Sequence, residues 1–343
     1  MGELSRRRFL QAAGAGGLGL VTLKTLAGTA FEGIPRASAT TSNVAKLGVF
    51  AEPAGGEATY LDAYNDFVSM IGRPADVYRT YRGWGQPLFN DAINAILADP
   101  NPPEIYVSFH AFFGSKATDP IPWADIAAGV YDAQIDSWAQ ELAQLGRHAY
   151  VCFHHEMENE ENKCGTPADF QAAYWHFRHR VQIDNGVTNL TWPIVYMRTT
   201  FNGKHGGPDR WWPDTSPDPD LQADHLVGVD IYNRYFCHNK KWQKFDQLTG
   251  VVHDFAVAKN RRLFIGECGC VEGNACGGTK LLGSAKARWF DDALTVMKGW
   301  DNLEALCYSQ TVDISTAWYR IDSSPQSQIH FSTLANDQMF GGV

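Results

Sequence analysis

Eight short apolar segments, separated by longer stretches with helical spacing, constrain the fold of this chain more than any other feature. They span residues 46–52, 76–84, 104–111, 148–156, 192–197, 225–232, 262–268 and 304–310. Each segment has the length and apolar character of a buried strand. The sequence therefore predicts eight strands that alternate with helices.

The intervening stretches carry apolar residues at helical spacing. Such sets occur at Leu61, Tyr64, Val68 and Ile71, and within residues 135–145, 170–181 and 245–255. One helix also shows its start, with Thr166 as the amino-terminal cap, Pro167 at the first helical position and Asp169 in the first turn. Repeated strand–helix alternation over about 250 residues predicts a single-domain (β/α)8 TIM barrel spanning residues 40–343.

An open, doubly wound sheet is the alternative fold. It would normally carry a glycine-rich phosphate loop after its first strand, and the segment AEPAGGEAT at residues 51–59 matches that pattern poorly. The segment GGPDRWWPDTSPDPD at residues 206–220 takes the place of a full fifth helix. We expect it to be a long loop within one domain rather than a domain boundary.

The first 39 residues have the pattern of an export signal. The segment SRRRFLQ precedes a glycine-rich apolar run, and residues 37–39 supply a small-residue cleavage pattern. The paired arginines resemble a twin-arginine signal, with an ordinary basic amino terminus as the alternative. Lys24 interrupts the apolar run well short of the roughly 20 residues that a membrane span needs. We therefore expect residues 1–39 to be removed and the protein to be secreted.

The charge of the chain limits its partners. The whole chain carries a formal net charge of −9, and its first 39 residues hold five basic and two acidic side chains, which leaves −12 on the remainder. An acidic surface disfavours nucleic acid and anionic membranes and suits a soluble protein with a neutral substrate. We expect a monomer.

The seven cysteines permit disulfides in an exported chain but leave one unpaired. Cys152 and Cys307 lie in apolar segments and should be buried, reduced core residues. The expected disulfides join cysteines of polar loops, namely Cys164 with Cys237 and Cys270 with Cys276. Zinc ligation is disfavoured because the chain lacks a CxxC pair.

Candidate functional residues are those at the carboxyl-terminal ends of the expected strands, where barrels carry their chemistry. These positions hold Trp84, His110, His155, Glu156, Tyr232, Glu267 and Trp318. A carboxylate directly after a buried strand costs free energy unless it is hydrogen-bonded or used. Glycoside hydrolysis needs two: one donates a proton to the leaving oxygen and the other attacks the anomeric carbon, about 5 to 5.5 Å away if configuration is retained.

Four motifs together resemble glycoside hydrolase family 26, a group of retaining, endo-acting barrel enzymes best known as β-mannanases. They are RTYRGW at 79–84, FHHEMEN at 153–159, WWP at 211–213 followed by VGVDIYN at 227–233, and FIGECG at 264–269. The resemblance extends from about Leu47 to Trp318. The histidine before Glu156 agrees with this family, whereas most related barrel hydrolases have asparagine there.

The resemblance implies a role for each site residue. Glu156 corresponds to the general acid/base and Glu267 to the nucleophile of a double displacement. His155 matches the histidine that contacts the sugar beside the acid. Tyr232 matches a tyrosine that hydrogen-bonds the nucleophile and keeps it ionised.

Aromatic and histidine side chains would complete the substrate site. Trp318 matches an aromatic platform for the sugar at the cleaved bond, and Trp84 and His110 are looser matches for sugar contacts. Tyr232 and Trp84 could instead be rim aromatics, and His110 could be a structural histidine. Trp212, with its neighbour at 211, could line a subsite or plug the barrel top.

One departure from the family concerns the substrate. The segment MENEENKCG at residues 157–165 places acids where the family has subsite aromatics. Another β-glycan, such as mixed-linkage glucan or xylan, or a charged or decorated one, is therefore an alternative to β-1,4-mannan. We expect Glu158, Glu160 and Glu161 to lie on a solvated loop.

Two other function classes were weighed. A zinc-protease HExxH motif would need histidine at position 159, which is Asn159. A metal-dependent barrel hydrolase could use His110, His154 and His155. A non-catalytic carbohydrate-binding barrel would keep the aromatics without needing both glutamates. We expect a secreted, retaining endo-β-glycanase that requires no cofactor or metal.

Overall fold

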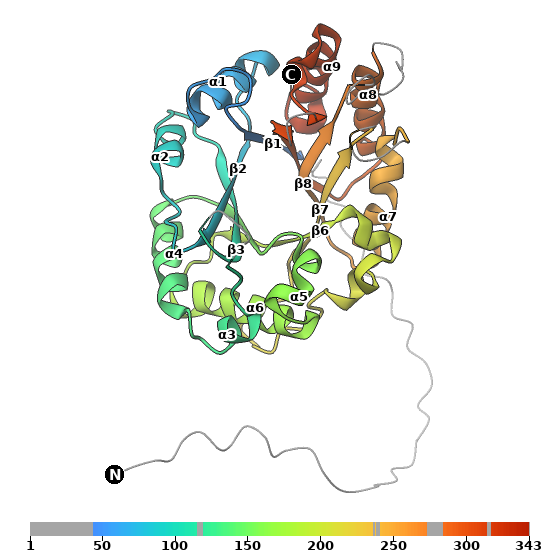
Figure 1. Cartoon of the computed structure of the whole chain (residues 1–343). Helices are drawn as coiled ribbons and strands as arrows, with labels where there is room; N and C mark the ends of the chain where they lie inside the picture. Colours follow the sequence, from blue (N-terminus) through green and yellow to red (C-terminus); the bar gives the residue numbers. More distant parts are fainter. Residues whose placement is uncertain are drawn as a thin grey trace, which may run out of the picture. The chain divides into compact units, whose positions relative to one another are not determined.

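The structure, a computed structural model, describes residues 44–114, 119–235, 237, 241–272, 284–313 and 317–342. Its strands form the wall of a barrel that is surrounded by helices (Figure 1). The expected signal at residues 1–39 and Cys276 lie outside the described residues. None of the described helices combines the length and apolarity needed to span a bilayer.

The barrel wall is a parallel sheet in the order β5-β4-β3-β2-β1-β9-β8-β7-β6. Its strands are β1 Lys46–Ala51, β2 Val77–Trp84, β3 Glu104–Phe113, β4 Ala149–Phe153, β5 Leu190–Thr191, β6 Pro193–Met197, β7 Leu226–Asn233, β8 Leu263–Cys270 and β9 Leu303–Gln310. Every predicted strand is present, with the two-residue β5 in addition. The predicted (β/α)8 barrel is confirmed, and the open doubly wound alternative is wrong.

The helices that cover the outside of the barrel include all those predicted. They are α1 Tyr60–Ile71, α2 Asp91–Leu97, α3 Trp123–Ala127, α4 Asp132–Gln144, α5 Glu161–Cys164, α6 Pro167–His179, α7 Phe245–Ala258, α8 Ala285–Met297 and α9 Pro325–Ala335. The predicted cap of α6 is confirmed: Thr166 Oγ1 accepts from the Asp169 N–H, and the Asp169 carboxylate accepts from the Thr166 N–H at 2.9 Å. Between β6 and β7 the chain forms only short 3-10 turns, as expected for a long loop.

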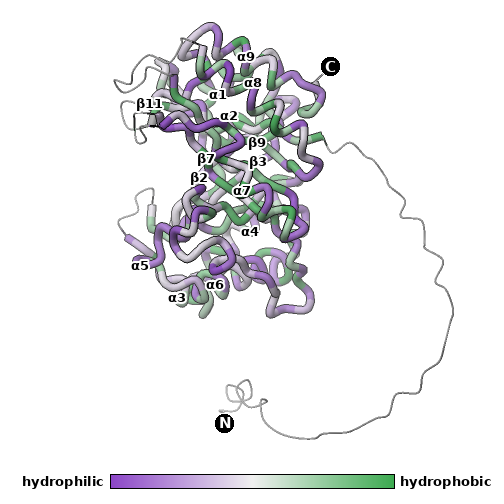
Figure 2. The backbone as a smooth tube through the Cα atoms, turned by 90° about the vertical axis from the view of Figure 1, so that its right-hand side faces the viewer, coloured by the Kyte–Doolittle hydropathy of each residue, from purple (hydrophilic) through white to green (hydrophobic). Residues whose placement is uncertain are grey.

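Apolar side chains fill two layers. A small set inside the barrel includes Val77, Cys152 and Phe264, and a much larger set lies between the sheet and the helices. Hydrophobic residues accordingly run along the strands through the middle of the molecule (Figure 2). Packing on both faces explains why the strands read as continuous apolar segments.

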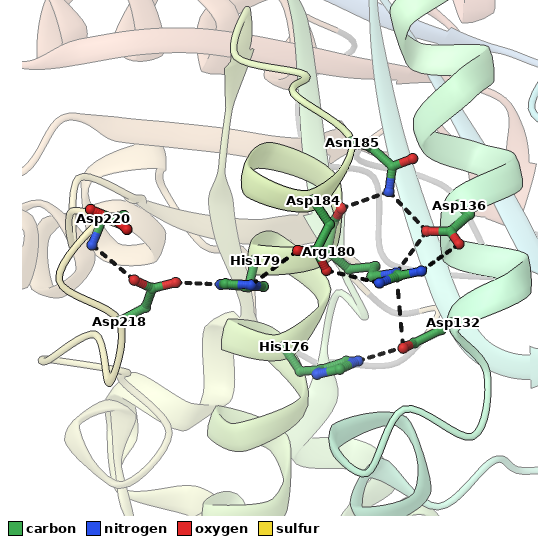
Figure 3. Close-up of polar contacts among 9 residues, drawn as sticks. All are labelled: Asp132, Asp136, His176, His179, Arg180, Asp184, Asn185, Asp218 and Asp220. Carbon is green, nitrogen blue, oxygen red and sulfur yellow. Dashed lines mark hydrogen bonds and ion pairs between the residues drawn. The ribbon is translucent and has the colours of Figure 1, made fainter.

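Charged side chains join the helices behind β4 on the outside of the barrel (Figure 3). Arg180, in a π-helical turn at Arg180–Asp184, donates to both carboxylate oxygens of Asp136 on α4 at 2.7 Å. His176 on α6 lies 2.6 Å from Asp132 at the start of α4. These contacts fix α4 to α6 and so support the strand between them in sequence, β4.

Both expected disulfides are wrong. Cys164 is a free, buried thiol at the end of α5, and Cys270 is a free, buried thiol at the end of β8 rather than in a loop. Cys237 is disulfide-bonded, but its partner lies outside the described residues. Cys152 and Cys307 are free and buried, as expected.

Candidate active site

Glu267 lies on β8 and is held by three donors, two from β2 and one from β7. Its Oε1 accepts hydrogen bonds from Arg79 Nη2 at 2.8 Å and from the Tyr81 hydroxyl at 2.6 Å. Its Oε2 accepts from the Tyr232 hydroxyl at 2.6 Å. Burial would raise the pKa of Glu267, but the Arg79 charge and the hydrogen bonds from Tyr232 and Tyr81 outweigh it, so the pKa is lowered. Glu267 is therefore an ionised carboxylate.

Gly266 makes this close packing possible. A Cβ atom at this position would lie 2.9 Å from Asp230 Oδ1, 3.0 Å from the Tyr106 hydroxyl and 3.1 Å from Arg79 Nη1. The pairing of β7 with β8 is also irregular here. Its register shifts between Val229 and Asp230, the residue that pairs with Glu267. A bulge of this kind re-aims side chains near the end of a strand.

Glu156 follows β4 in a backbone turn that L-residues rarely adopt. His154 and Glu156 have φ values of 53° and 52°, in the left-handed region. Two hydrogen bonds fix the turn: the His154 N–H donates to Phe109 O at 2.8 Å, and the Glu156 N–H donates to Val195 O at 2.7 Å. Such strained positions persist only where the surroundings enforce them, and they cluster at functional sites.

The pKa of Glu156 is shifted in the opposite direction to that of Glu267. Burial, followed by the negative charges of Glu267 and Glu158, raises the pKa of Glu156 to about 8, and Arg234 and Arg79 only partly oppose this. Glu156 therefore keeps its proton at neutral pH while Glu267 does not. One neutral and one ionised carboxyl group in a shared site can act as acid and nucleophile.

His155 and His110 are packed beside Glu267. Their rings are 4.2 Å apart, and His155 Nε2 lies 3.9 Å from Glu267 Oε1. Burial lowers the pKa of His110 to about 4 and also lowers that of His155, so both imidazoles are neutral. His155 Nδ1 and His110 Nε2 are buried and have no hydrogen-bond partner among the described residues.

The three histidines of the alternative metal hypothesis, His110, His154 and His155, do not converge. His154 Nδ1 accepts a hydrogen bond from Trp123 Nε1 at 3.0 Å, away from the carboxylates. Within the described part of the chain, the group that could hold a metal is His155, Asp230 and Glu267. Arg79 lies against it, with Nη2 2.8 Å from Glu267 and 4.0 Å from Asp230. A cationic side chain thus already stands where a cation would bind.

Three site residues were missed in the sequence. Arg79 and Tyr81 come from β2, inside the motif RTYRGW, and alternate so that both face Glu267. Asp230 on β7 is buried, and neither of its oxygens has a hydrogen-bond partner among the described residues. Burial and the Glu267 charge raise the pKa of Asp230 well above its usual range. A charged residue within an apolar strand was the signal for Asp230.

A cavity of about 250 Å³ opens in front of Glu267. It is lined by Phe50, Glu52, Tyr81, Tyr232, Arg234, Glu267, Thr311, Val312 and Tyr319. A second cavity of about 360 Å³ shares the walls Phe50 and Tyr81 with it. Trp318 on β11 (Ala317–Trp318) is 40% exposed and pairs directly opposite Val312 on β10 (Val312–Asp313). Its ring is therefore free to stack beside the first cavity.

Trp84 and Trp212 are not substrate-facing, contrary to expectation. Trp84 is 2% exposed and packs edge-on against Trp138 at 4.8 Å. Trp212 is 4% exposed and packs against His225 and Phe255. Both rings lie between sheet and helices, so neither lines a subsite or plugs the barrel top.

The loop after Glu156 also differs from expectation. Glu158 is 1% exposed and Glu160 is 8% exposed, so the solvated-loop interpretation is wrong for both. Glu161 is half-buried and forms an ion pair with Arg210. The left-handed turn at Glu156 directs this segment back against the barrel instead of into solvent.

The sequence itself matches no protein-family model and no curated protein. The structure matches many solved ones. A family 26 β-mannanase from Bacteroides ovatus has a TM-score of 0.58 and 14% identity, over 87% of this chain and 90% of the other. The chain has the fold of the family 26 β-mannanases. The resemblance seen in the motifs is thereby confirmed at the level of the fold.

Other solved structures with this mannanase-like fold include a second bacterial enzyme and fungal ones. A double mutant of the Cellulomonas fimi endo-β-1,4-mannanase has a TM-score of 0.58 and 16% identity, over 87% of this chain and 72% of the other. Fungal β-1,4-galactanases have a TM-score of 0.60 and 13% identity, over 86% of this chain and all of the other. At these identities the likeness establishes the fold, and the substrate must be argued from the site.

Proposed function

We propose that the protein is a secreted, retaining, endo-acting glycoside hydrolase, with β-1,4-mannan as its first candidate substrate. The observation that carries the proposal is the opposite protonation of two carboxyl groups in one site. Glu267 is held ionised by Arg79, Tyr81 and Tyr232. Glu156 has its pKa raised to about 8 by burial and by the Glu267 charge.

The reaction follows from these two states. Glu156 donates its proton to the glycosidic oxygen as the bond between that oxygen and the anomeric carbon breaks. A Glu267 oxygen attacks the same carbon from the opposite face and forms a glycosyl ester. Glu156, now a carboxylate, takes a proton from water, and the water oxygen displaces Glu267. Two inversions give net retention of configuration.

The site has space and side chains suited to a sugar beside Glu267. The cavity in front of Glu267 gives room for a sugar residue, and a second cavity adjoins it at Phe50 and Tyr81. Trp318 offers an exposed ring for stacking on a sugar. No cofactor takes part in this reaction.

The first experiment is a panel of soluble polysaccharides with the full-length protein. It contains galactomannan, glucomannan, mixed-linkage β-glucan, xylan and β-1,4-galactan, the last because fungal galactanases share the fold. We expect internal cleavage of one or more, seen as a rapid fall in viscosity, and retention at the new reducing end by NMR. Binding without cleavage of any of them would indicate a carbohydrate-binding barrel instead.

Two variants separate the roles of the carboxyl groups. Glu156→Gln should lose roughly 10² to 10⁴-fold on polysaccharides. On an aryl glycoside whose leaving group needs no proton, kcat/KM should change little, whereas kcat should fall because hydrolysis of the glycosyl ester still needs the base. Glu267→Ala should lose activity on both kinds of substrate. Glu161→Gln, in the same loop, is the matched control and should keep wild-type turnover. Wild-type turnover by either active-site variant would refute the assignment.

A further inference from the structure

Glu158 is a buried carboxyl group two residues after Glu156. Its Oε1 accepts hydrogen bonds from the Met197 N–H at 2.8 Å and from the Thr200 hydroxyl at 2.5 Å. Its Oε2 is buried and has no hydrogen-bond partner among the described residues. Buried polar groups are normally paired, so a carboxyl group that is satisfied on one oxygen and bare on the other needs an explanation. A proton on the bare oxygen would remove the cost of an unpaired buried charge.

The turn that contains both carboxyl groups is fixed to β6 at two points. The Glu156 N–H donates to Val195 O, and two residues further along each segment Glu158 accepts from Met197 N–H. The 3-10 turn η1, Met157–Glu160, is therefore held alongside β6. It cannot shift without breaking the hydrogen bond to Val195 O or the one from the Met197 N–H. Glu158 thus holds the turn through its side chain, whereas Glu156 holds it only through its backbone and keeps its side chain for the site.

The surroundings of Glu158 are acidic or neutral. It raises the pKa of Glu156, of Tyr196 on β6 and of Asp230 on β7. Among the described residues no basic side chain forms an ion pair with Glu158. Burial raises its own pKa to about 7, against the opposing hydrogen bonds from Thr200 and the backbone. The other charged groups that act on Glu156 are Glu267 on β8, Arg79 on β2 and Arg234 after β7.

We propose that Glu158 is a positioning residue for Glu156: it clamps the turn against β6, and its charge sets the pH range over which Glu156 keeps its proton. This rests on the proposed function, in which Glu156 is the general acid. An ionised Glu158 raises the pKa of Glu156, because a nearby like charge disfavours the charged form, and it thereby extends the acid form of Glu156 to higher pH.

Glu158→Gln separates the charge from the clamp. The glutamine oxygen can accept the same two hydrogen bonds, but the side chain carries no charge at any pH. The alkaline limb of the kcat/KM profile should move down by about one pH unit, because the pKa of Glu156 falls when a neighbouring negative charge is removed. The acidic limb should move less, since the largest influences on the pKa of Glu267 are burial, the Arg79 charge and the hydrogen bonds from Tyr232 and Tyr81.

Two further variants separate an effect of the Glu158 charge from a loss of structure. Thr200→Val removes one hydrogen bond that favours ionised Glu158, so it should move the alkaline limb in the same direction by a smaller amount. Glu158→Leu removes both clamp and charge, and it should lower kcat at every pH in addition to the shift. If Glu158→Gln and Thr200→Val lower kcat without moving the limb, Glu158 is structural only and the proposal is overturned.

A titration without turnover distinguishes this inference from the proposed function. The Glu156 carboxyl carbon can be followed by ¹³C NMR, assigned by its loss in Glu156→Gln, in wild type and in Glu158→Gln. A lower midpoint in Glu158→Gln supports the proposal even if no polysaccharide is cleaved, in which case the function alone has failed. An unchanged midpoint overturns the proposal even in an active enzyme. Glu161→Gln is the control and should leave the midpoint unchanged.

Discussion

Arg79 and Glu267 form an ion pair inside the barrel, with 2.8 Å between Nη2 and Oε1 and no solvent exposure of the Arg79 side chain. The same guanidinium nitrogen lies 4.0 Å from Asp230, and Nη1 donates to Gly266 O at 2.9 Å. Arg79 therefore joins β2 to β8 and balances the charge of the buried Glu267 carboxylate. Several measurable consequences depend on this arrangement.

Removal of Arg79 should destabilise the protein strongly. Arg79→Met leaves Glu267 as a buried charge without its cation, which costs about 3 to 5 kcal/mol of the free energy of unfolding in such cases. Urea denaturation measures the change. The control is Lys298→Met, which breaks an exposed ion pair with Asp337 and should cost less than about 1 kcal/mol. Equal losses in the two variants would contradict the prediction.

Tyr232→Phe should change the acidic limb of the pH profile. The Tyr232 hydroxyl lowers the pKa of Glu267, so its removal raises that pKa and moves the acidic limb of kcat/KM to higher pH. Loss of a hydrogen bond to a charged group should also reduce kcat/KM by about 10 to 100-fold. Tyr64→Phe, a buried tyrosine on α1, is the control. A limb that moves to lower pH would show that the hydrogen bond does not favour the ionised form.

Stability should depend on pH through Glu156. Its pKa is raised from about 4.5 to about 8 by folding, so the folded state binds this proton more tightly than the unfolded state does. The resulting stabilisation is complete below pH 4.5 and is lost as pH rises towards 8. The difference in unfolding free energy between wild type and Glu156→Gln should therefore change by about 1 to 3 kcal/mol across this range. A constant difference would contradict the raised pKa.

The two tryptophans Trp318 and Trp84 should respond in opposite ways to replacement by alanine. Trp318 is 40% exposed, so Trp318→Ala should leave the melting temperature nearly unchanged but raise KM if its ring contacts substrate. Trp84→Ala removes a buried ring and should cost about 3 to 5 kcal/mol of stability. The fraction of Trp84→Ala that remains folded should keep wild-type KM. A normal KM for Trp318→Ala would remove it from the substrate site.

Chelation tests the remaining metal hypothesis. Arg79 lies against His155, Asp230 and Glu267, the described group able to hold a metal, and supplies positive charge there. Dialysis against EDTA should therefore leave hydrolysis unchanged, and added Zn²⁺ should not stimulate it. Loss of activity on chelation, restored by metal, would show that the site binds a cation despite Arg79.

The sequence predicted the barrel and the two carboxyl positions because these depend on local pattern. Eight apolar segments gave eight strands. Glu156 follows the end of β4, and Glu267 lies within β8, shortly before its end at Cys270. The prediction that Trp84 contacts substrate was wrong for a local reason too. Side chains alternate along β2, so Arg79 and Tyr81 point to the barrel interior and Trp84 points to the helices. Strict attention to this alternation would have found Arg79 and Tyr81 and rejected Trp84.

Other features depend on contacts that no short pattern encodes. Glu158 is buried because the chain turns back at His154 and Glu156, which have left-handed backbone conformations. The sequence around these two residues does not predict that conformation. Cys164 and Cys270 are in segments that looked polar, yet packing places both thiols in the interior. The environment of these residues is set by strands distant in sequence.

The left-handed backbone conformation of Glu156 costs stability at a residue that the proposed activity requires. A non-glycine residue held at a φ of 52° costs free energy, which glycine would not incur. Glu156→Gly should therefore relieve backbone strain and the burial of a carboxyl group together, and yield an inactive protein that melts at a higher temperature than wild type. Selection for thermal stability alone would therefore favour loss of Glu156, the proposed general acid, so stabilised variants of this barrel must be screened for turnover at every round.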